Sequence, residues 1–114
     1  MSNVVKIREV GLRDGLQLIK SNLSTESKLI WVNKQVSAGF TEMEVTSFVP
    51  PKLLPQFSDA SEIIIKSNKI KKLKPTALIL NIKVAIRAIE AGTKKITFVL
   101  SASEKNTLYN VNCT

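Results

Sequence analysis

Apolar residues recur along the chain in two alternating spacings. Short or alternating apolar runs, which are typical of strands, occupy residues 4–9, 41–46, 76–80 and 95–100. Between these runs, apolar spacings of three and four residues predict helices over residues 25–38, 59–69 and 82–91. Residues 47–58 contain three prolines and predict a loop, and residues 101–114 have no clear period. The order βαβαβαβ predicts a parallel α/β sheet with right-handed crossovers, as in doubly wound sheets and (β/α)8 barrels.

Polar residues and glycines mark the expected ends of these helices. Ser24 and Asn81 are good N-caps for the first and third helices. Asp59 resembles half of a capping pair with the glutamate three residues later, ahead of the second helix. Gly39 and Gly92 follow the last apolar positions of the first and third helices, where glycine is a common stop.

Length and charge limit the kind of protein this is. The chain has 114 residues, of which 44% are hydrophobic, so one domain over residues 1–114 is expected. Lys and Arg total 17 against nine acidic residues, a net charge of +8. Outside residues 66–74 the basic residues are dispersed, and no aromatic residues interleave with that run as nucleic-acid binding would require. A lysine-rich solvated surface is therefore expected, and the charge also suits an anionic small molecule such as an acyl-coenzyme A.

Cysteine and histidine usage narrows the chemistry further. A single cysteine, Cys113, excludes an internal disulfide framework and a cysteine-rich zinc site. The chain has no histidine, so it lacks the usual general base and the commonest metal ligand. No apolar run reaches about 18 residues and no signal-peptide core is present, so a cytoplasmic protein without a membrane span is expected.

The stretch from Val10 to Gln17, directly after the first expected strand, is a candidate for the centre of a site. Two glycines bracket Arg13 and Asp14, so the backbone is expected to turn tightly there. In α/β proteins, ligands and catalytic groups gather at the ends of strands. Asp14 is a hard oxygen ligand suited to Mg or Mn, and Arg13 is suited to stabilising a developing oxyanion. The alternative is an exposed turn with a solvated Arg-Asp pair.

Further polar side chains are expected near the strand ends. Glu9 and Gln17 flank the Arg-Asp pair, while Glu44, Thr46 and Ser47 lie at the end of the second expected strand. In a barrel these groups would converge on one face. For Glu44 a solvent-facing position is the alternative, because strand alternation puts another glutamate on the same face.

Two long motifs carry a resemblance to a known family. Residues 9–17 read Glu-Val-Gly-Leu-Arg-Asp-Gly-Leu-Gln, and residues 44–52 read Glu-Val-Thr-Ser-Phe-Val-Pro-Pro-Lys. With shorter matches at residues 55–56, 81–83, 90–92, 102–104 and 112–113, they closely resemble the 3-hydroxy-3-methylglutaryl-CoA lyase family. Related synthases typically carry Glu at the position of Leu16 and lack the Thr-Ser-Phe-Val stretch. The resemblance therefore favours the lyase branch.

This resemblance implies a partial TIM (β/α)8 barrel, about the first four strands with three helices, and a metal-dependent reaction. The reaction is retro-Claisen cleavage of 3-hydroxy-3-methylglutaryl-CoA to acetyl-CoA and acetoacetate, as in leucine degradation and ketone body metabolism. By resemblance, Asp14 is a ligand of a divalent metal (Mg or Mn), Arg13 stabilises the enolate, and Glu44 orients groups around metal and substrate. The implied lining of the acyl-CoA site includes Glu9, Gln17, Ser47 and Ser103.

The chain also departs from the family pattern. Val84 stands where the family has glycine, and Cys113 matches a structural-looking cysteine instead of the catalytic one. A complete barrel has eight βα units and about 250 residues, and the family's His-x-His ligands have no match here. The resemblance thus implies the N-terminal half of a lyase, inactive by itself.

Two alternatives to that reading stay open. One is a split lyase, in which a complementary C-terminal half on another chain supplies the remaining strands. The other is a non-catalytic half-barrel, either an acyl-CoA-binding or interaction module or the product of a decayed gene. In each case the open sheet edges predict self-association or pairing with a partner.

Overall fold

The structure is a computed structural model that describes residues 4–102 of the chain. Its sheet has three parallel strands in the order β1-β2-β3, namely β1 (Glu42–Ser47), β2 (Lys74–Ile79) and β3 (Lys95–Phe98). Three α-helices alternate with these strands: α1 (Thr25–Ser37), α2 (Ala60–Ser67) and α3 (Ile82–Glu90). Two short helical turns, η1 (Gly11–Gly15) and η2 (Pro55–Phe57), lie in the connections. The predicted α/β class and parallel sheet are confirmed.

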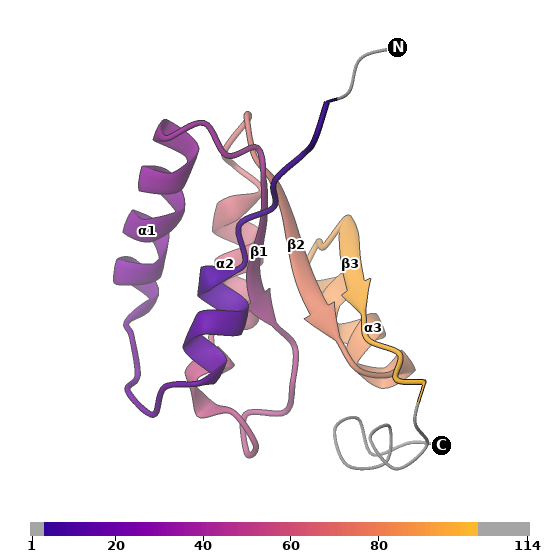
Figure 1. Ribbon diagram of the computed structural model, residues 1–114. Helices are drawn as coiled ribbons and strands as arrows, with labels where there is room; N and C mark the ends of the chain where they lie inside the picture. Colours follow the sequence, from indigo (N-terminus) through magenta and orange to yellow (C-terminus); the bar gives the residue numbers. More distant parts are fainter. Residues whose placement is uncertain (1–3, 103–114) are drawn as a thin grey trace.

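The helices are arranged around the sheet as alternating βα units require. In Figure 1, α2 lies behind β1, and α1 stands beside α2 on the side away from β2. Helix α3 packs on β2. The core between these layers is apolar and includes the fully buried Val32, Met43, Val45, Ile63 and Ile64.

The prediction of a full strand over residues 4–9 is wrong. This segment forms only a single parallel bridge, in which Glu9 pairs with Met43. The N–H of Glu9 donates to the carbonyl of Glu42 at 3.2 Å, and the N–H of Glu44 donates back to the carbonyl of Glu9 at 2.9 Å. This register explains the difference. Because β1 begins at Glu42, the residues before Glu9 extend past the start of β1, and the chain turns into η1 soon after Glu9.

The helix ends agree with the sequence signals at two of three N-caps. The side chains of Ser24 and Asn81 accept backbone N–H groups at 3.1 and 3.0 Å, as predicted. The predicted cap at Asp59 is wrong, because its side chain makes no capping hydrogen bond and its carboxylate contacts α1 instead. Gly39 and Gly92 have φ of +105° and +98°, which explains why glycine ends α1 and α3.

Helix α3 buries a different face from the one that its isoleucines suggest. The buried residues are Val84 and Ala88, whereas Ile82, Ile86 and Ile89 are exposed. The main strand contact of α3 is with β2, and the face that meets it carries Val84 and Ala88 while the larger isoleucines stay outside. Apolar residues at this end of the sheet are therefore uncovered in the part of the chain that the structure describes.

Candidate active site

The η1 segment, a turn of π-helix over Gly11–Gly15, presents the central Arg-Asp pair. The N–H of Asp14 donates to the carbonyl of Val10 at 2.7 Å. Leu12 and Leu16 are buried in the core, so they anchor one face of the turn. Arg13 and Asp14 consequently lie on the opposite, more open face. Single turns of π-helix occur frequently at functional sites.

The sequence predicts that the two glycines of this turn permit a tight backbone conformation, but the structure gives them a different role. The positive-φ glycines among residues 4–102 are Gly39 and Gly92, so neither Gly11 nor Gly15 needs glycine for its φ. Gly11 is required by space, because a Cβ there would lie 2.6 Å from Glu9 Oε1 and 2.9 Å from the Trp31 ring. The N–H of Gly11 also donates to Glu9 Oε1 at 2.8 Å.

Arg13 joins this turn to β1 through Glu44. Its Nε and Nη2 atoms both lie 3.1 Å from Glu44 Oε2. The Glu44 side chain is only 3% exposed, so the solvent-facing alternative for this residue is wrong. The remaining nitrogen, Nη1, lies 3.2 Å from Asp14 Oδ1 and 3.5 Å from Gln17 Oε1. Arg13 thus brings four of the predicted site residues, itself included, into one hydrogen-bonded group.

A bulge in β1 lies directly beside this group. Glu44 pairs with Thr76, yet Thr46 pairs with Ala77, so Val45 is an extra residue on β1. Bulges redirect side chains and are common next to active sites. Here the bulge changes the register immediately after the carboxylate that holds Arg13.

Ser47 and Glu9, two of the predicted lining residues, have local partners instead of an open surface. Ser47 is fully buried, and its Oγ accepts the N–H of Val49 at 3.3 Å. The Glu9 carboxylate accepts the N–H of Gly11. Both residues therefore support the turn and the strand end. Ser103 lies outside the described residues.

A cavity of about 340 Å³ opens beside Arg13 at the carboxyl ends of the strands. Arg13 and Gln17 form its polar wall, and its apolar wall is formed by Val49, Leu53, Leu54, Leu78, Leu80 and Val99. Because β2 ends at Ile79 and β3 at Phe98, this cavity lies where parallel α/β sheets bind their ligands. The sequence reasoning missed the apolar wall, although the strand-end rule applied to the second half of the sheet would have indicated it.

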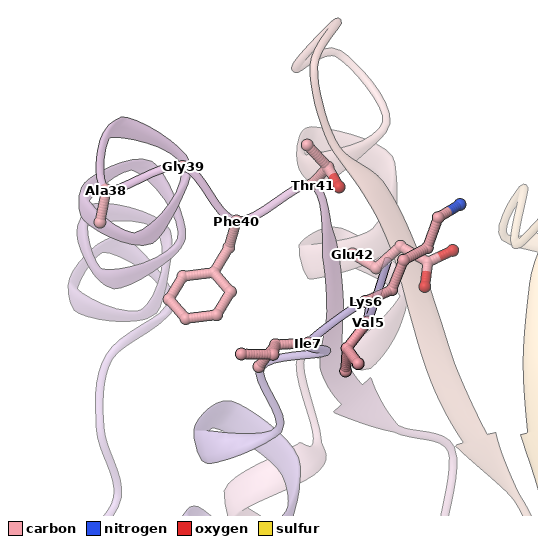
Figure 2. Close-up of a pocket in the computed structure, with 8 residues that line it drawn as sticks. All are labelled: Val5, Lys6, Ile7, Ala38, Gly39, Phe40, Thr41 and Glu42. Atoms are coloured by element: carbon pink, nitrogen blue, oxygen red, sulfur yellow. The ribbon is translucent and has the colours of Figure 1, made fainter. Parts of the chain in front are cut away.

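A second cavity of similar volume lies at the other end of β1. It is lined by residues 5–7 and 38–42, between the N-terminal segment and the end of α1. Figure 2 shows the Phe40 ring and the Ile7 side chain facing each other, with Lys6 and Glu42 on the far side of Ile7. This cavity lies at the amino end of β1 and is separate from the Arg13 group. In parallel barrels that end of the sheet is associated with stability, and catalysis with the carboxyl end.

The described residues do not form a metal site by themselves. Within residues 4–102, no three or more His, Cys, Asp or Glu side chains are grouped so that they could hold a metal ion. Asp14 is 60% exposed, and one of its oxygens is within reach of Arg13. It is thus available as one oxygen ligand, and further ligands would have to come from other residues.

Comparison with known proteins places this geometry in a family. The family model described as HMGL-like matches residues 4–114, which is almost the whole chain. The chain belongs to the HMGL-like family. Its curated relatives include the mitochondrial hydroxymethylglutaryl-CoA lyase of Arabidopsis thaliana, which is 41% identical over 110 residues. The hydroxymethylglutaryl-CoA lyase YngG of Bacillus subtilis is 36% identical over 108 residues.

The solved structures of this family share the fold of the HMGL-like chain. An HMG-CoA lyase from Acinetobacter baumannii, in complex with coenzyme A and 3-methylmalate, matches 97% of the chain with a TM-score of 0.89 and 35% identity. The lyase of Bacillus subtilis matches 96% of it with a TM-score of 0.86. The three-stranded sheet and its helices are therefore part of a TIM barrel, as predicted.

This HMGL-like chain is much shorter than its relatives. It spans 24% of the Arabidopsis protein and 36% of each of the Bacillus and Acinetobacter proteins. The shared region is thus nearer a third of a lyase than the half that the strand count suggested.

The location in the cell stays a prediction. Among residues 4–102, none of the helices is both long enough and apolar enough to cross a membrane. The names of several relatives place them in mitochondria, so the expected cytoplasmic location has no direct support from the comparisons.

Proposed function

We propose that this chain supplies the Arg13 side of an active site that cleaves 3-hydroxy-3-methylglutaryl-CoA into acetyl-CoA and acetoacetate. The observation that carries the proposal is the Arg13–Glu44 pair at the wall of a cavity at the carboxyl ends of the strands. The Arg13 guanidinium is fixed by the buried Glu44 carboxylate, and Arg13 faces a cavity with both polar and apolar walls. Such a site suits an acyl thioester that develops negative charge during reaction.

The proposed chemistry is a retro-Claisen cleavage. The proton of the 3-hydroxyl group passes to a base, the C2–C3 bond breaks, and its electron pair moves into the thioester enolate. The 3-carbon becomes the ketone of acetoacetate, and protonation of the enolate at carbon gives acetyl-CoA. Arg13 donates hydrogen bonds to the enolate oxygen. A donor of this kind is worth on the order of 3 kcal/mol in transition-state stabilisation.

The supporting residues have separate roles in this proposal. Glu44 orients the Arg13 guanidinium, since it holds both Nε and Nη2. Asp14 supplies one oxygen ligand to a divalent cation, Mg or Mn, which when bound polarises the substrate oxygens. Gln17 lines the cavity beside Arg13, and on the family motifs we assign further substrate lining to Ser103. Glu9 and Ser47, which the same motifs include, support this lining from behind through their contacts with the turn and the strand end.

The comparisons favour an acyl-CoA as the ligand class. The Acinetobacter relative was solved with coenzyme A and 3-methylmalate, a dicarboxylic acid. Both compounds are anions, and the chain carries a net charge of +8. A phosphate-bearing and carboxylate-bearing ligand would be attracted by that charge.

A second candidate is a non-catalytic module whose sheet edge pairs with another chain. The observation that favours it is the apolar surface at β3, where Ile96 and Phe98 are exposed and Phe98 lines one hollow with the exposed Ile82 of α3. In a split lyase the same edge would receive a complementary half that carries the missing histidine ligands. The two candidates therefore differ in whether pairing produces activity.

The test is complementation. The isolated chain with Mg or Mn is expected to show no measurable cleavage, because the chain has no histidine and no group of three or more possible ligands occurs among residues 4–102. Co-expression with a histidine-bearing C-terminal portion of a close relative is expected to release acetoacetate from the CoA ester. Arg13→Gln in that assembly should lower the rate by at least about a hundredfold, while Asp14→Asn should weaken metal binding.

Two results would overturn the proposed function. One is a folded, metal-loaded assembly whose rate is unchanged by Arg13→Gln. The other is a folded assembly that binds the CoA ester and never releases acetoacetate, which would favour the non-catalytic module.

A further inference from the structure

A buried lysine on α1 contacts the loop that precedes α2. Lys28 is 3% exposed, and its Nζ donates to the carbonyl of Gln56 at 2.5 Å and to Asp59 Oδ1 at 2.7 Å. The hydroxyl of Thr25 donates to the other carboxylate oxygen of Asp59 at 2.5 Å. A charge is costly to bury unless it is paired and hydrogen-bonded. The contacts of Lys28 meet that requirement and fix the Gln56 backbone against α1.

The Gln56 side chain extends this chain of contacts to the turn that carries Arg13 and Asp14. Its Nε2 donates to the carbonyls of Leu16, Gln17 and Ile19 at 3.1, 3.4 and 3.2 Å. These carbonyls lie at the end of the helical segment that begins at Gly11 and directly after it. The last carbonyls of a helix have few partners within it, although the Leu16 carbonyl also accepts the N–H of Ile19 at 3.3 Å. The two protons of one amide group are therefore shared among carbonyls at the end of the segment that carries Arg13 and Asp14.

The contacts form a continuous path from α1 to the site. Lys28 holds the Gln56 backbone, the Gln56 amide holds the end of the turn, and the turn presents Arg13 to Glu44. Figure 1 shows η1 and the loop before α2 close together at the same end of the sheet. Neither Lys28 nor Gln56 lines the cavity beside Arg13, so neither is placed to touch a substrate there.

We propose that Lys28 and Gln56 are positioning residues, which fix the turn of residues 11–17 so that Arg13 and Asp14 hold their orientation. The proposal rests on the proposed function only in taking Arg13 and Asp14 as the groups to be positioned. It differs from a general contribution to stability. A positioning contact should change the motion of the turn while leaving the sheet as it is.

The experiment is backbone amide exchange, measured residue by residue on the whole chain with the variants Gln56→Met and Lys28→Met. Gln56→Met keeps the backbone carbonyl that Lys28 uses and removes the donor to the turn. It should speed exchange at residues 13–19 by at least about tenfold, while exchange in β1 and β2 changes less than about twofold. Lys28→Met should have the same local effect. Lys66→Met is the matched control, because it removes an exposed pair with Glu62 and should change neither region.

A second measurement follows the Arg13 Nε–H group, which donates to Glu44. Its exchange should also accelerate in Gln56→Met. Equal acceleration of exchange in the turn and in the sheet, or no acceleration in the turn, would overturn the proposal. If Lys28→Met fails to fold, the result for Gln56→Met decides. Because exchange requires no turnover, a failed complementation assay would leave this result intact. In an active assembly, Gln56→Met should lower kcat with little change in KM.

Discussion

Arg13 and Glu44 lie 31 positions apart in the chain, and their side chains meet in two contacts of 3.1 Å. The pair ties a short helical turn to the end of β1, and it places a carboxylate where almost no water reaches it. The arginine is partly exposed toward the cavity, while the glutamate is not. This asymmetry means that Arg13 faces the cavity, while Glu44 holds Arg13 in place.

Replacing Arg13 with an uncharged residue should therefore leave the buried Glu44 carboxylate without its partner. Arg13→Met is expected to lower the free energy of unfolding by about 3 kcal/mol, because breaking a buried pair costs more than the pair contributes. Asp14→Asn is the control, since Asp14 is mostly exposed, and should change stability by less than about 0.5 kcal/mol. Urea unfolding at neutral pH measures both. Equal effects from the two variants would contradict the burial argument.

The two glycines of the turn should respond oppositely to alanine. At Gly11 the new methyl group would press on the Trp31 ring and on Glu9, so Gly11→Ala should cost about 1–3 kcal/mol. At Gly15 nothing lies within 4 Å of the added carbon, and the φ angle is ordinary. Gly15→Ala should therefore stabilise the chain by about 0.5–1 kcal/mol. Thermal unfolding compares them, and a loss of stability at Gly15 would show that its neighbourhood is tighter than the structure indicates.

The fold was largely predictable because local signals and global topology agreed. The periods of two and of three to four residues gave the strands and helices, and Ser24 and Asn81 act as the N-caps that the sequence indicates. The error at residues 4–9 has a physical cause. Alternation identifies an extended segment, but only the register with β1 decides how many of its residues find a partner.

The pH dependence of stability should depend on Glu42. Its carboxylate lies 2.8 Å from Lys95 Nζ, and this hydrogen bond, helped by the charges of Lys95 and Arg8, lowers the pKa of Glu42 below its ordinary value of 4.5. The folded state therefore binds a proton less readily than the unfolded state. This contribution to stability is present above that ordinary value and is lost as pH falls through the lower folded pKa.

The variant Glu42→Gln tests this linkage. It should be less stable than the unsubstituted chain near neutral pH, and the difference should shrink as pH is lowered below 4.5. In a Lys95→Met background the same substitution should have a smaller effect, because the main cause of the pKa shift is absent. Urea unfolding across the pH range measures this. A constant difference at all pH values would contradict it.

The edge at β3 should drive association. Among the described residues β3 pairs with β2 on one side, and Phe98 is half exposed. An unpaired edge with apolar side chains is a template for another chain. The protein at micromolar concentration is therefore expected to sediment as dimers or larger assemblies, and Phe98→Lys should shift it toward monomer. A folded monomer before any substitution would contradict this prediction.

The site was less predictable than the fold, for a reason visible in Gln56. The family motifs indicated Arg13, Asp14 and Glu44, but a motif does not show which side chain holds another. The role of Gln56 depends on carbonyls some forty positions away in the chain. The burial of Lys28 was equally hidden, because a lysine on an exposed-looking helix normally points to solvent. Long-range polar contacts of this kind appear only once the chain is folded.

The close packing of Trp31 against Gly11 gives this protein a fluorescent reporter at the turn that carries Arg13 and Asp14. Trp31 is the chain's single tryptophan, and a carbon added at Gly11 would lie 2.9 Å from its indole ring. Tryptophan fluorescence, excited where tyrosine absorbs little, therefore comes from one place, against the backbone that leads directly to Arg13. Ligands that shift the turn should alter the emission of the unlabelled protein, and the amplitude of the signal would grade candidate compounds in solution before any enzymatic assay exists.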